Sequence, residues 1–276
     1  GSACPPADQL LAMTAEIGPF IAAGRTADVY AWGTNQVLKL YHDWFELEAI
    51  QFERRLAQVV QASGLSVPAV GEIVQVNGRN GLIYQRVEGS LMWDVLARKP
   101  WCIFHCARRT AELHVALHGV IAPMDLPDQK QRLQRKIERA GALSKGFRQR
   151  ALAALDKLPA GDRICHGDFH PGNILLTGRG EVVIDWIDVT RGNPLADLAR
   201  SSILALGAAS TMQVPQVAMK ASLRLFHTLY MQQYFRLRPG GMAEYRQWLP
   251  VVAAARLSEN IPELEQWLVA QAAVLD

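Results

Sequence analysis

The sequence of 276 residues has little of what marks several common classes of protein. Its four cysteines form no CxxC pair and no Cys/His set with zinc-site spacing. The longest apolar stretch, residues 203–209, is bounded by Ser202 and Ser210 and is far too short to cross a bilayer. Lys and Arg do not gather into one block, and the net charge is only +3. We therefore expect no zinc module, no membrane span and no nucleic-acid partner.

The composition favours a folded chain with a substantial core. Half of the residues are apolar and 20% are charged, which suits one or two domains. The N-terminus carries no signal-peptide pattern, so we expect a cytoplasmic protein whose cysteines, Cys4, Cys102, Cys106 and Cys165, are free thiols. The sequence leaves the oligomeric state open.

The pattern of apolar and turn residues changes once along the chain. Up to about residue 90 it predicts short strands, one helix over 44–62, and turns such as Asn77-Gly78. The predicted strands cover 20–22, 29–32, 37–41, 72–76 and 82–86. Beyond residue 90 the pattern is mostly helical, apart from a hairpin near 173–186. We therefore predict an α+β chain in two domains: a small antiparallel β-sheet lobe with one helix at 1–86, and a larger, mainly helical lobe at 87–276.

The most informative stretch runs from His166 to Leu176 and reads H-G-D-F-H-P-G-N-I-L-L. It is followed by V-V-I-D-W, in which the acid is Asp185. A hairpin between the two can return Asp185 close to Asn173, and carboxylate and amide oxygens are ligands that Mg²⁺ prefers. Asp168 remains free to orient a hydroxyl and take its proton. A D-x-x-x-x-N loop followed by a metal-binding Asp is typical of phosphoryl transfer.

These motifs closely resemble those of the aminoglycoside phosphotransferase and choline-kinase-like family. The strings H-G-D-x-H-P-x-N-I-L and I-D-W carry the resemblance, which is tightest at residues 163–200 and looser in the first lobe. The resemblance implies a bilobal protein-kinase-like fold and phosphate transfer from ATP with Mg²⁺. It also implies that Asp168 is the catalytic base, that Asn173 and Asp185 bind the metal, and that Asp197 braces the catalytic loop.

The first lobe should then hold the nucleotide. Gly24 and Thr26 lie in a turn between two predicted strands, where backbone N–H groups and a hydroxyl can cover phosphates, although an ordinary hairpin turn has the same pattern. Lys39 lies inside the strand at 37–41. It is either an exposed strand lysine or, in this context, the lysine that pairs the α- and β-phosphates.

A lysine in that role needs a carboxylate on the following helix. Glu46, Glu48 and Glu53 are the candidates, and helical spacing puts Glu53 on an inward stripe, with Glu46 as the second choice. The adenine is expected to meet the main chain of the link at Gln85, Arg86 and Val87.

Other polar residues have plainer interpretations. His114 and His118 have the spacing of helical metal ligands, but no third ligand motif accompanies them, so packing beneath the catalytic loop is favoured. His166 is interpreted as a scaffold residue, and His170 either supports the loop or contacts phosphate.

Three acids that follow Asp185 in the chain have less certain roles in the sequence. Asp188 either faces the acceptor or caps the next segment. Glu259 and Glu263 are candidates to line a substrate cleft, but the interpretation as surface carboxylates is favoured.

The absence of several protein-kinase sequence elements narrows the class of phosphate acceptor. Too little chain follows Asp185 for a long activation segment, no A-P-E element is present, and Gly167 stands where protein kinases usually have an Arg. We therefore expect a small hydroxyl-bearing molecule as partner. Aminoglycosides, macrolides, amino alcohols, sugars and nucleosides remain open, as does GTP in place of ATP. The alternatives are a catalytically weak regulatory protein of kinase fold and transfer of a nucleotidyl group.

Overall fold

The structure, a computed structural model, describes residues 17–211 and 217–275. These residues divide into two compact units. The first contains the chain up to Gly89 together with Thr177–Ile187, and the second contains Ser90–Leu176 and the chain from Asp188 onward. The lobe boundary at residue 86 stays a prediction.

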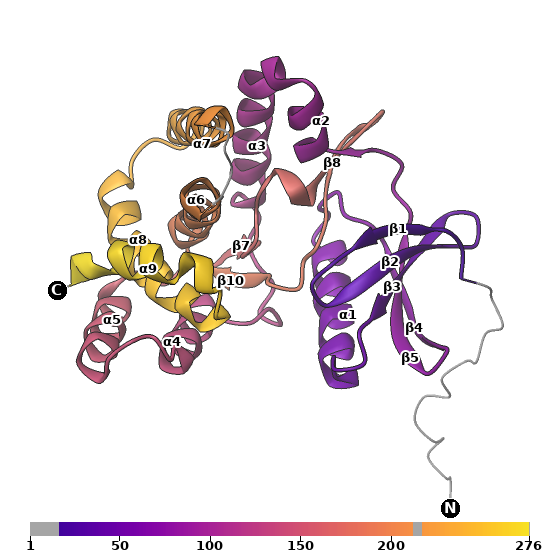
Figure 1. The fold of residues 1–276 in the computed structure, drawn as a ribbon, viewed down its shortest axis with the longest axis horizontal. Helices are drawn as coiled ribbons and strands as arrows, with labels where there is room; N and C mark the ends of the chain where they lie inside the picture. Colours follow the sequence, from indigo (N-terminus) through magenta and orange to yellow (C-terminus); the bar gives the residue numbers. More distant parts are fainter. Residues whose placement is uncertain (1–16, 212–216, 276) are drawn as a thin grey trace, which may run out of the picture. The chain divides into compact units, whose positions relative to one another are not determined.

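The first unit is built on an antiparallel sheet of five strands in the order β1-β2-β3-β5-β4, with helix α1 (Figure 1). Its elements are β1 (Phe20–Ala23), β2 (Ala27–Trp32), β3 (Gln36–Tyr41), α1 (Leu47–Ala62), β4 (Val70–Val76), β5 (Arg79–Gln85) and β9 (Gly180–Val183). Asn77 and Gly78 have φ of 52° and 80°, as a tight turn between β4 and β5 requires. The predicted strands and this turn are confirmed, whereas the helix begins at Leu47 rather than near residue 44 because Glu46 is still extended.

Each face of this sheet carries a cluster of buried apolar residues, and the face determines the environment of Lys39. Successive side chains of a strand point to opposite faces. Leu38 and Leu40 therefore pack in one core cluster of the sheet, while Tyr41 packs with Ile50 of α1 in the other. Lys39 is on the face of Tyr41, and its side chain is only 18% exposed. It is not an exposed strand lysine.

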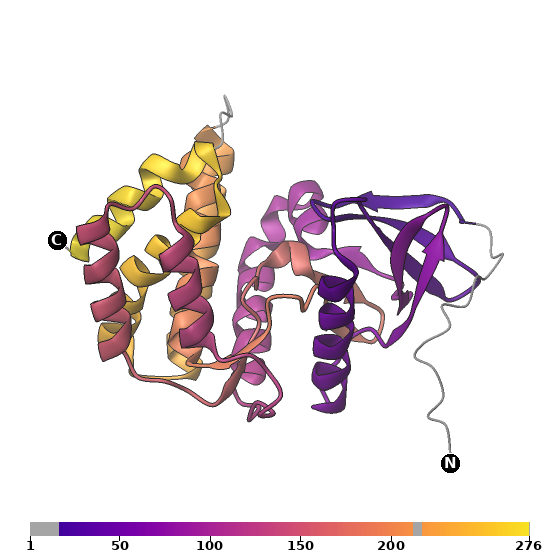
Figure 2. The ribbon, with the colours of Figure 1, turned by 90° about the horizontal axis from the view of Figure 1, so that it is seen from below.

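The second unit is mainly helical, as predicted. Helix α3 packs against α7, and α6 packs against α8 and α7, so that the long helices form the bundle seen in Figure 2. Its helices are α2 (Met92–Arg98), α3 (Ile103–Leu117), α4 (Gln129–Arg139), α5 (Lys145–Lys157), α6 (Pro194–Thr211), α7 (Val217–Leu237), α8 (Met242–Arg256) and α9 (Pro262–Ala272). Single turns of 3-10 helix cover Pro100–Cys102, Pro171–Asn173, Leu257–Glu259 and Ala273–Leu275.

The short strands of this unit are β6 (Ser90–Leu91), β7 (Arg163–Cys165), β8 (Ile174–Thr177) and β10 (Thr190–Gly192). β8 lies in the predicted hairpin region. The others were not predicted, because two or three residues carry too little alternation to be recognised as strands.

The pairing of two short strands positions the segments of the candidate site. β7 pairs with β10 in antiparallel register, which brings the chain just before His166 beside the chain just before Asn193. Asn193 then starts α6, since its side-chain oxygen accepts a hydrogen bond from Leu195 N–H at 2.9 Å. The first turn of α6 therefore comes to lie beneath the segment that carries Asp168.

Two predictions from composition can be compared with the structure. Cys102, Cys106 and Cys165 are free thiols, and Cys4 lies outside the described residues. Within residues 17–211 and 217–275, the helices are all too short or too polar to cross a bilayer.

Candidate active site

Lys39 is held by carboxylates in the first unit. Its Nζ lies 2.8 Å from Glu53 Oε1 and 3.5 Å from Asp185 Oδ1. Glu53 is only 3% exposed and also accepts a hydrogen bond of 2.9 Å from the hydroxyl of Tyr84. Burial by itself lowers the pKa of Lys39, but the negative charges of Asp185 and Glu53 outweigh it and raise the pKa above the usual value. Lys39 is therefore a fixed positive charge.

Glu46 does not take part in this cluster. It is exposed at the N-cap of α1, one turn before the first buried residue of the helix, Ile50. Of the carboxylates considered from the sequence, Glu53 is the one that the structure brings to Lys39.

Asp185 has an unusual backbone conformation. Its φ is 62°, in the left-handed region that residues other than glycine rarely adopt. Its side chain is 42% exposed, so one oxygen can face Lys39 while the carboxylate remains accessible. A non-glycine residue held in such a conformation costs about 1–3 kcal/mol and is a common feature of functional sites.

The turn with Gly24 and Thr26 is open to solvent. Gly24 is exposed and Thr26 is half-buried. Gly24 N–H donates to Ala27 O at 2.9 Å, and Thr26 O accepts from His42 N–H at 3.0 Å. A Cβ on Gly24 would lie 2.8 Å from Ala27 O, so this tight turn favours glycine.

The link after β5 has part of its hydrogen bonding already used. The side-chain oxygen of Gln85 accepts from Ala69 N–H at 3.2 Å, and Arg86 N–H donates to Asn35 O at 2.9 Å. Val87 follows and is half-buried. The side chain of Gln85 therefore has a structural role in this link.

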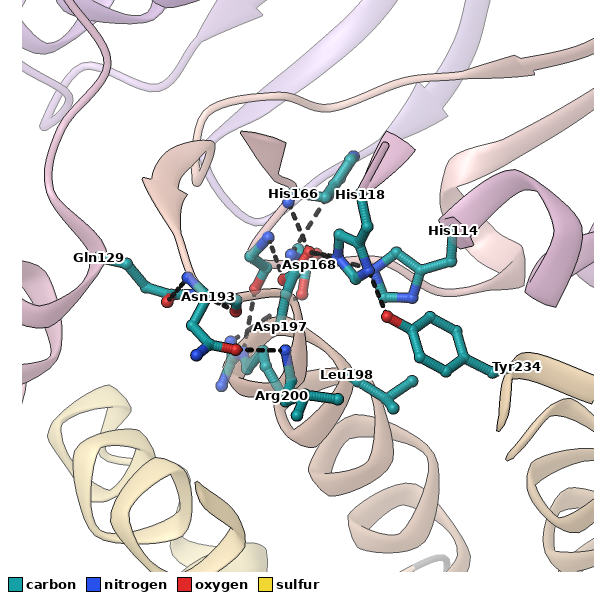
Figure 3. Close-up of polar contacts among 12 residues, drawn as sticks. His114, His118, Gln129, His166, Asp168, Asn193, Asp197, Leu198, Arg200 and Tyr234 are labelled. Atoms are coloured by element: carbon teal, nitrogen blue, oxygen red, sulfur yellow. Dashed lines mark hydrogen bonds and ion pairs between the residues drawn. The ribbon is translucent and has the colours of Figure 1, made fainter. Parts of the chain in front are cut away.

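In the second unit, Asp197 holds the segment that contains Asp168 (Figure 3). Asp197 is 1% exposed. Its Oδ2 accepts a hydrogen bond of 2.7 Å from His166 N–H, and its Oδ1 accepts one of 2.8 Å from Gly167 N–H. The implied bracing role of Asp197 is confirmed by these contacts, because two successive backbone amides are fixed just before Asp168.

His114 and His118 complete this buried network. Their Nε2 atoms lie 3.1 and 3.2 Å from Asp197 Oδ2. Because a carboxylate can only accept, both Nε2 atoms carry hydrogen, and both Nδ1 atoms are left to accept from the hydroxyls of Tyr230 and Tyr234 at 2.5 and 2.8 Å.

This arrangement also settles how His114 and His118 should be interpreted. The three groups Asp197, His114 and His118 are close enough to hold a metal ion. Every polar atom of the two rings already has a protein partner, however, and burial lowers both pKa values, that of His114 to about 4. The rings are neutral structural groups beneath the loop, as the sequence favoured.

Asp168 lies in a polar setting made by its own loop and by α6. Asn173 Nδ2 donates to Asp168 O at 2.9 Å and to Asp168 Oδ2 at 3.1 Å. His170 Nε2 lies 3.4 Å from Oδ2, and Arg200 lies 3.9 Å from Oδ1. Burial raises the pKa of Asp168, but the hydrogen bond and charge of His170, with Arg200 and His166, hold it well below its usual range. Asp168 is thus ionised at neutral pH.

The histidines of the loop act on its backbone. His170 Nδ1 accepts from Gly172 N–H at 3.0 Å, and His166 Nδ1 accepts from Asp168 N–H at 3.2 Å. Both rings therefore support the loop conformation, and for His170 this is the first of the two interpretations left open by the sequence.

Gly167 has a conformation and surroundings that only glycine allows. Its φ is +80°, and a Cβ there would lie 2.5 Å from the backbone oxygen of Asp188. The close approach brings Asp188 beside the loop, where its side chain pairs with Arg132. Asp188 also lines a cavity beside this loop, together with Arg132.

Sequence reasoning missed a group of charged residues next to this loop. Glu259 was interpreted as a surface carboxylate, and that was wrong, because its side chain is 15% exposed and lies 2.8 Å from Arg200 and 3.2 Å from Lys136. Glu263 is exposed, as expected. Arg200 and Glu259 are 59 residues apart in sequence, so no local pattern could have paired them.

Comparison with known proteins can now be added to this geometry. The model of a family described as phosphotransferase enzyme family matches residues 18–219. No curated protein matches the sequence. Among solved structures, the chain is similar to a choline/ethanolamine kinase family protein from Mesorhizobium loti, with 17% identity, a TM-score of 0.60, and coverage of 94% of this chain and 88% of that one.

Two aminoglycoside phosphotransferases are also similar in structure. APH(2'')-Ib, solved with ADP bound, is 15% identical with a TM-score of 0.60, and 95% of this chain and 93% of that chain are covered. APH(2")-IIa, solved in a ternary complex with streptomycin and ATP, is 14% identical with a TM-score of 0.57 and coverage of 95% and 92%. At these identities the likeness shows the fold, and it confirms the predicted α+β, bilobal protein-kinase-like fold.

Proposed function

The chain belongs to the phosphotransferase enzyme family, and from this premise we propose that it is an ATP- and Mg²⁺-dependent small-molecule kinase. It transfers the γ-phosphoryl group to a hydroxyl of a small acceptor. The observation that carries the proposal is the ionised Asp168, which is hydrogen-bonded to Asn173 in a loop whose amides are held by the buried Asp197. This is the arrangement expected for a group that must orient a hydroxyl.

Lys39 is assigned to the α- and β-phosphates, with Glu53 as its positioning residue. The support is the buried ion pair of 2.8 Å, which keeps the Lys39 ammonium charged and restricts its position. Gly24 and Thr26 are assigned to the phosphates, and the main chain at Gln85, Arg86 and Val87 to the base. Similar phosphotransferases solved with ADP or ATP support the use of a nucleotide.

Asn173 and Asp185 are proposed as the magnesium ligands. Their chemistry fits the ion, because carboxylate and amide oxygens are hard donors. Asn173 uses its Nδ2 for Asp168, which leaves its amide oxygen as the atom to offer a metal. Asp185 keeps an accessible carboxylate. When bound, Mg²⁺ supplies positive charge that stabilises the phosphates during transfer.

Asp168 is proposed to accept the proton of the acceptor hydroxyl. As the new bond to the γ-phosphorus forms and the bond to the β–γ bridging oxygen breaks, ADP leaves with the electron pair of the broken bond. Because the pKa of Asp168 is low, the carboxylate is a weak base and its main contribution is orientation. That suits a loose phosphoryl-transfer transition state, in which the hydroxyl loses its proton late.

The first experiment is nucleotide consumption with Mg²⁺ and either ATP or GTP. The acceptors are aminoglycosides, macrolides, amino alcohols, sugars and nucleosides, and Asp168→Ala is the blank. We expect turnover that disappears in Asp168→Ala while ATP affinity stays largely intact. Asp185→Asn should weaken Mg·ATP binding. Binding of ATP without turnover by any acceptor would favour the alternative, a regulatory protein of kinase fold, and absence of both would reject the proposal.

The location of the protein also stays a proposal. The three free cysteines of the described chain, Cys102, Cys106 and Cys165, are those of a protein in a reducing compartment, and we place it in the cytoplasm.

A further inference from the structure

A cavity of about 50 Å³ lies in the second unit, between α4, α6 and α8 and beside the loop of Asp168. Gly167 and Asp188 form part of its wall, and Val252 and Ala255 form an apolar part. Four basic side chains line it: Arg132, Lys136, Arg200 and Arg256. A space of this size can take a small polar group such as a carboxylate.

The carboxylates near this cavity are largely occupied. Asp188 pairs with Arg132. Asp197 accepts four hydrogen bonds in the network described above. Asp168 is engaged by Asn173 and His170 and is 3.9 Å from Arg200.

Glu259 is therefore the acceptor that the remaining cations share. Its carboxylate lies 3.2 Å from Lys136 Nζ, 2.8 Å from Arg200 and 3.5 Å from Arg256 Nε. Three cations around one carboxylate have more hydrogen-bond donors than this carboxylate can accept.

Arg256 shows this excess most directly. It is only 8% exposed, and its Nε and Nη1 atoms are buried and form no hydrogen bond with any described residue. Burial and the neighbouring charge of Arg200 lower its pKa to about 10, and burial likewise lowers the pKa of Lys136. A buried guanidinium with unused donors is costly unless a further acceptor enters the site.

We propose that this cavity binds an anionic group of the acceptor, a carboxylate or a phosphate, with Arg256 and Lys136 as specificity-determining residues. The inference rests on the proposed kinase function and assigns its substrate class: a hydroxyl compound that carries an acid, not a polycation. The cavity is close to the proposed base, since Arg200 contacts both Glu259 and Asp168. A cationic acceptor would instead meet the positive charges of Lys136, Arg200 and Arg256, which exceed the charge of the one carboxylate they share, Glu259.

The test uses the full chain and related sugars of different charge: neutral glucose, anionic gluconate and glucose 6-phosphate, and cationic glucosamine, with inorganic phosphate as a fifth ligand. Thermal shift and calorimetry are measured at constant ionic strength in a Lys39→Ala background, which weakens anion binding at the proposed nucleotide site. We expect gluconate, glucose 6-phosphate or phosphate to stabilise the protein, and glucose and glucosamine to have no effect.

Arg256→Gln should weaken anion binding about tenfold or more. Arg246→Gln is the matched control, because Arg246 is exposed on the same helix. Arg256→Met should also raise the melting temperature without any ligand, because it removes a poorly satisfied buried charge. A preference for glucosamine or glucose, no response to any anion, or anion binding unchanged by Arg256→Gln would overturn the proposal.

Binding of Mg·ATP to the wild-type protein is measured in parallel. If Mg·ATP binds and the neutral or cationic sugar is preferred, the kinase function stands and the anion site is rejected. If anions bind through Arg256 but Mg·ATP does not bind, the anion site stands and the proposed kinase function is rejected.

Discussion

Replacing Asp197 by Asn is the sharpest test of how the candidate site is held together. The carboxylate accepts hydrogen bonds from four donors: the backbone N–H groups of His166 and Gly167, at 2.7 and 2.8 Å, and Nε2 of His114 and His118, at 3.1 and 3.2 Å. An amide has the same shape but only one acceptor oxygen. In either orientation its NH₂ group faces at least one backbone N–H, so two donors oppose each other in a buried site.

The loss of stability follows from these contacts. A buried donor left without a partner costs about 1–3 kcal/mol, and the remaining bonds lose their assistance from charge. Because removal of one partner from a buried charged network costs about 3–5 kcal/mol, we expect Asp197→Asn to lower the free energy of unfolding by a similar amount. The loop that carries Asp168 is no longer fixed, and a displacement of about 1 Å should reduce kcat roughly 10²-fold.

The assay is urea unfolding at neutral pH, combined with kcat and the KM for ATP on whichever acceptor is active. Asp125→Asn is the matched control, since Asp125 is exposed in the same unit, and it should match the wild type. Asp197→Asn should lower kcat more than it raises the KM for ATP. A loss of less than about 1 kcal/mol with normal kcat would refute the view that Asp197 holds the loop.

Three further predictions concern single sites. Gly167→Ala should lower the free energy of unfolding, measured by thermal unfolding, by more than about 2 kcal/mol, because φ is +80° and the new Cβ would lie 2.5 Å from a backbone oxygen. Gly141→Ala is the control and should have no such effect, because nothing lies within 4 Å of a Cβ there. The pKa of His114 is about 4 in the folded protein against 6.5 in an unfolded chain, so the unfolded state binds more protons between these values. The contribution of His114 to the free energy of unfolding should therefore fall by about 3 kcal/mol as the pH drops from 6.5 to 4, measured by urea unfolding across that range. A free energy of unfolding that does not change with pH would contradict the burial of a neutral His114. Glu53→Gln should reduce kcat/KM for ATP about 10- to 100-fold, because Lys39 is no longer held in place. Unchanged kinetics would show that the Lys39–Glu53 ion pair has no role in nucleotide binding.

Much of the fold and part of the site followed from local sequence. Asn77-Gly78 predicted a tight turn because both residues readily adopt positive φ, and the apolar residues on both sides of Lys39 predicted a strand over 37–41. The spacing of Asp168, Asn173 and Asp185 predicted the chemistry, because an acid, an amide and a second acid on one short stretch of sequence are typical of phosphoryl transfer. Short-range patterns of this kind depend only on neighbours in the sequence.

Contacts between distant segments required the folded chain. Asp197 contacts His114 across 83 residues. The cluster of Lys136, Arg200, Arg256 and Glu259 comes from α4, α6, α8 and the 3-10 turn that follows α8, so no spacing in the sequence predicts either contact. Charged residues usually lie at the surface, which is why Glu259 was misjudged. Packing of the helices buried these side chains together and set their pKa values, because desolvation and partner distance are properties of the tertiary structure.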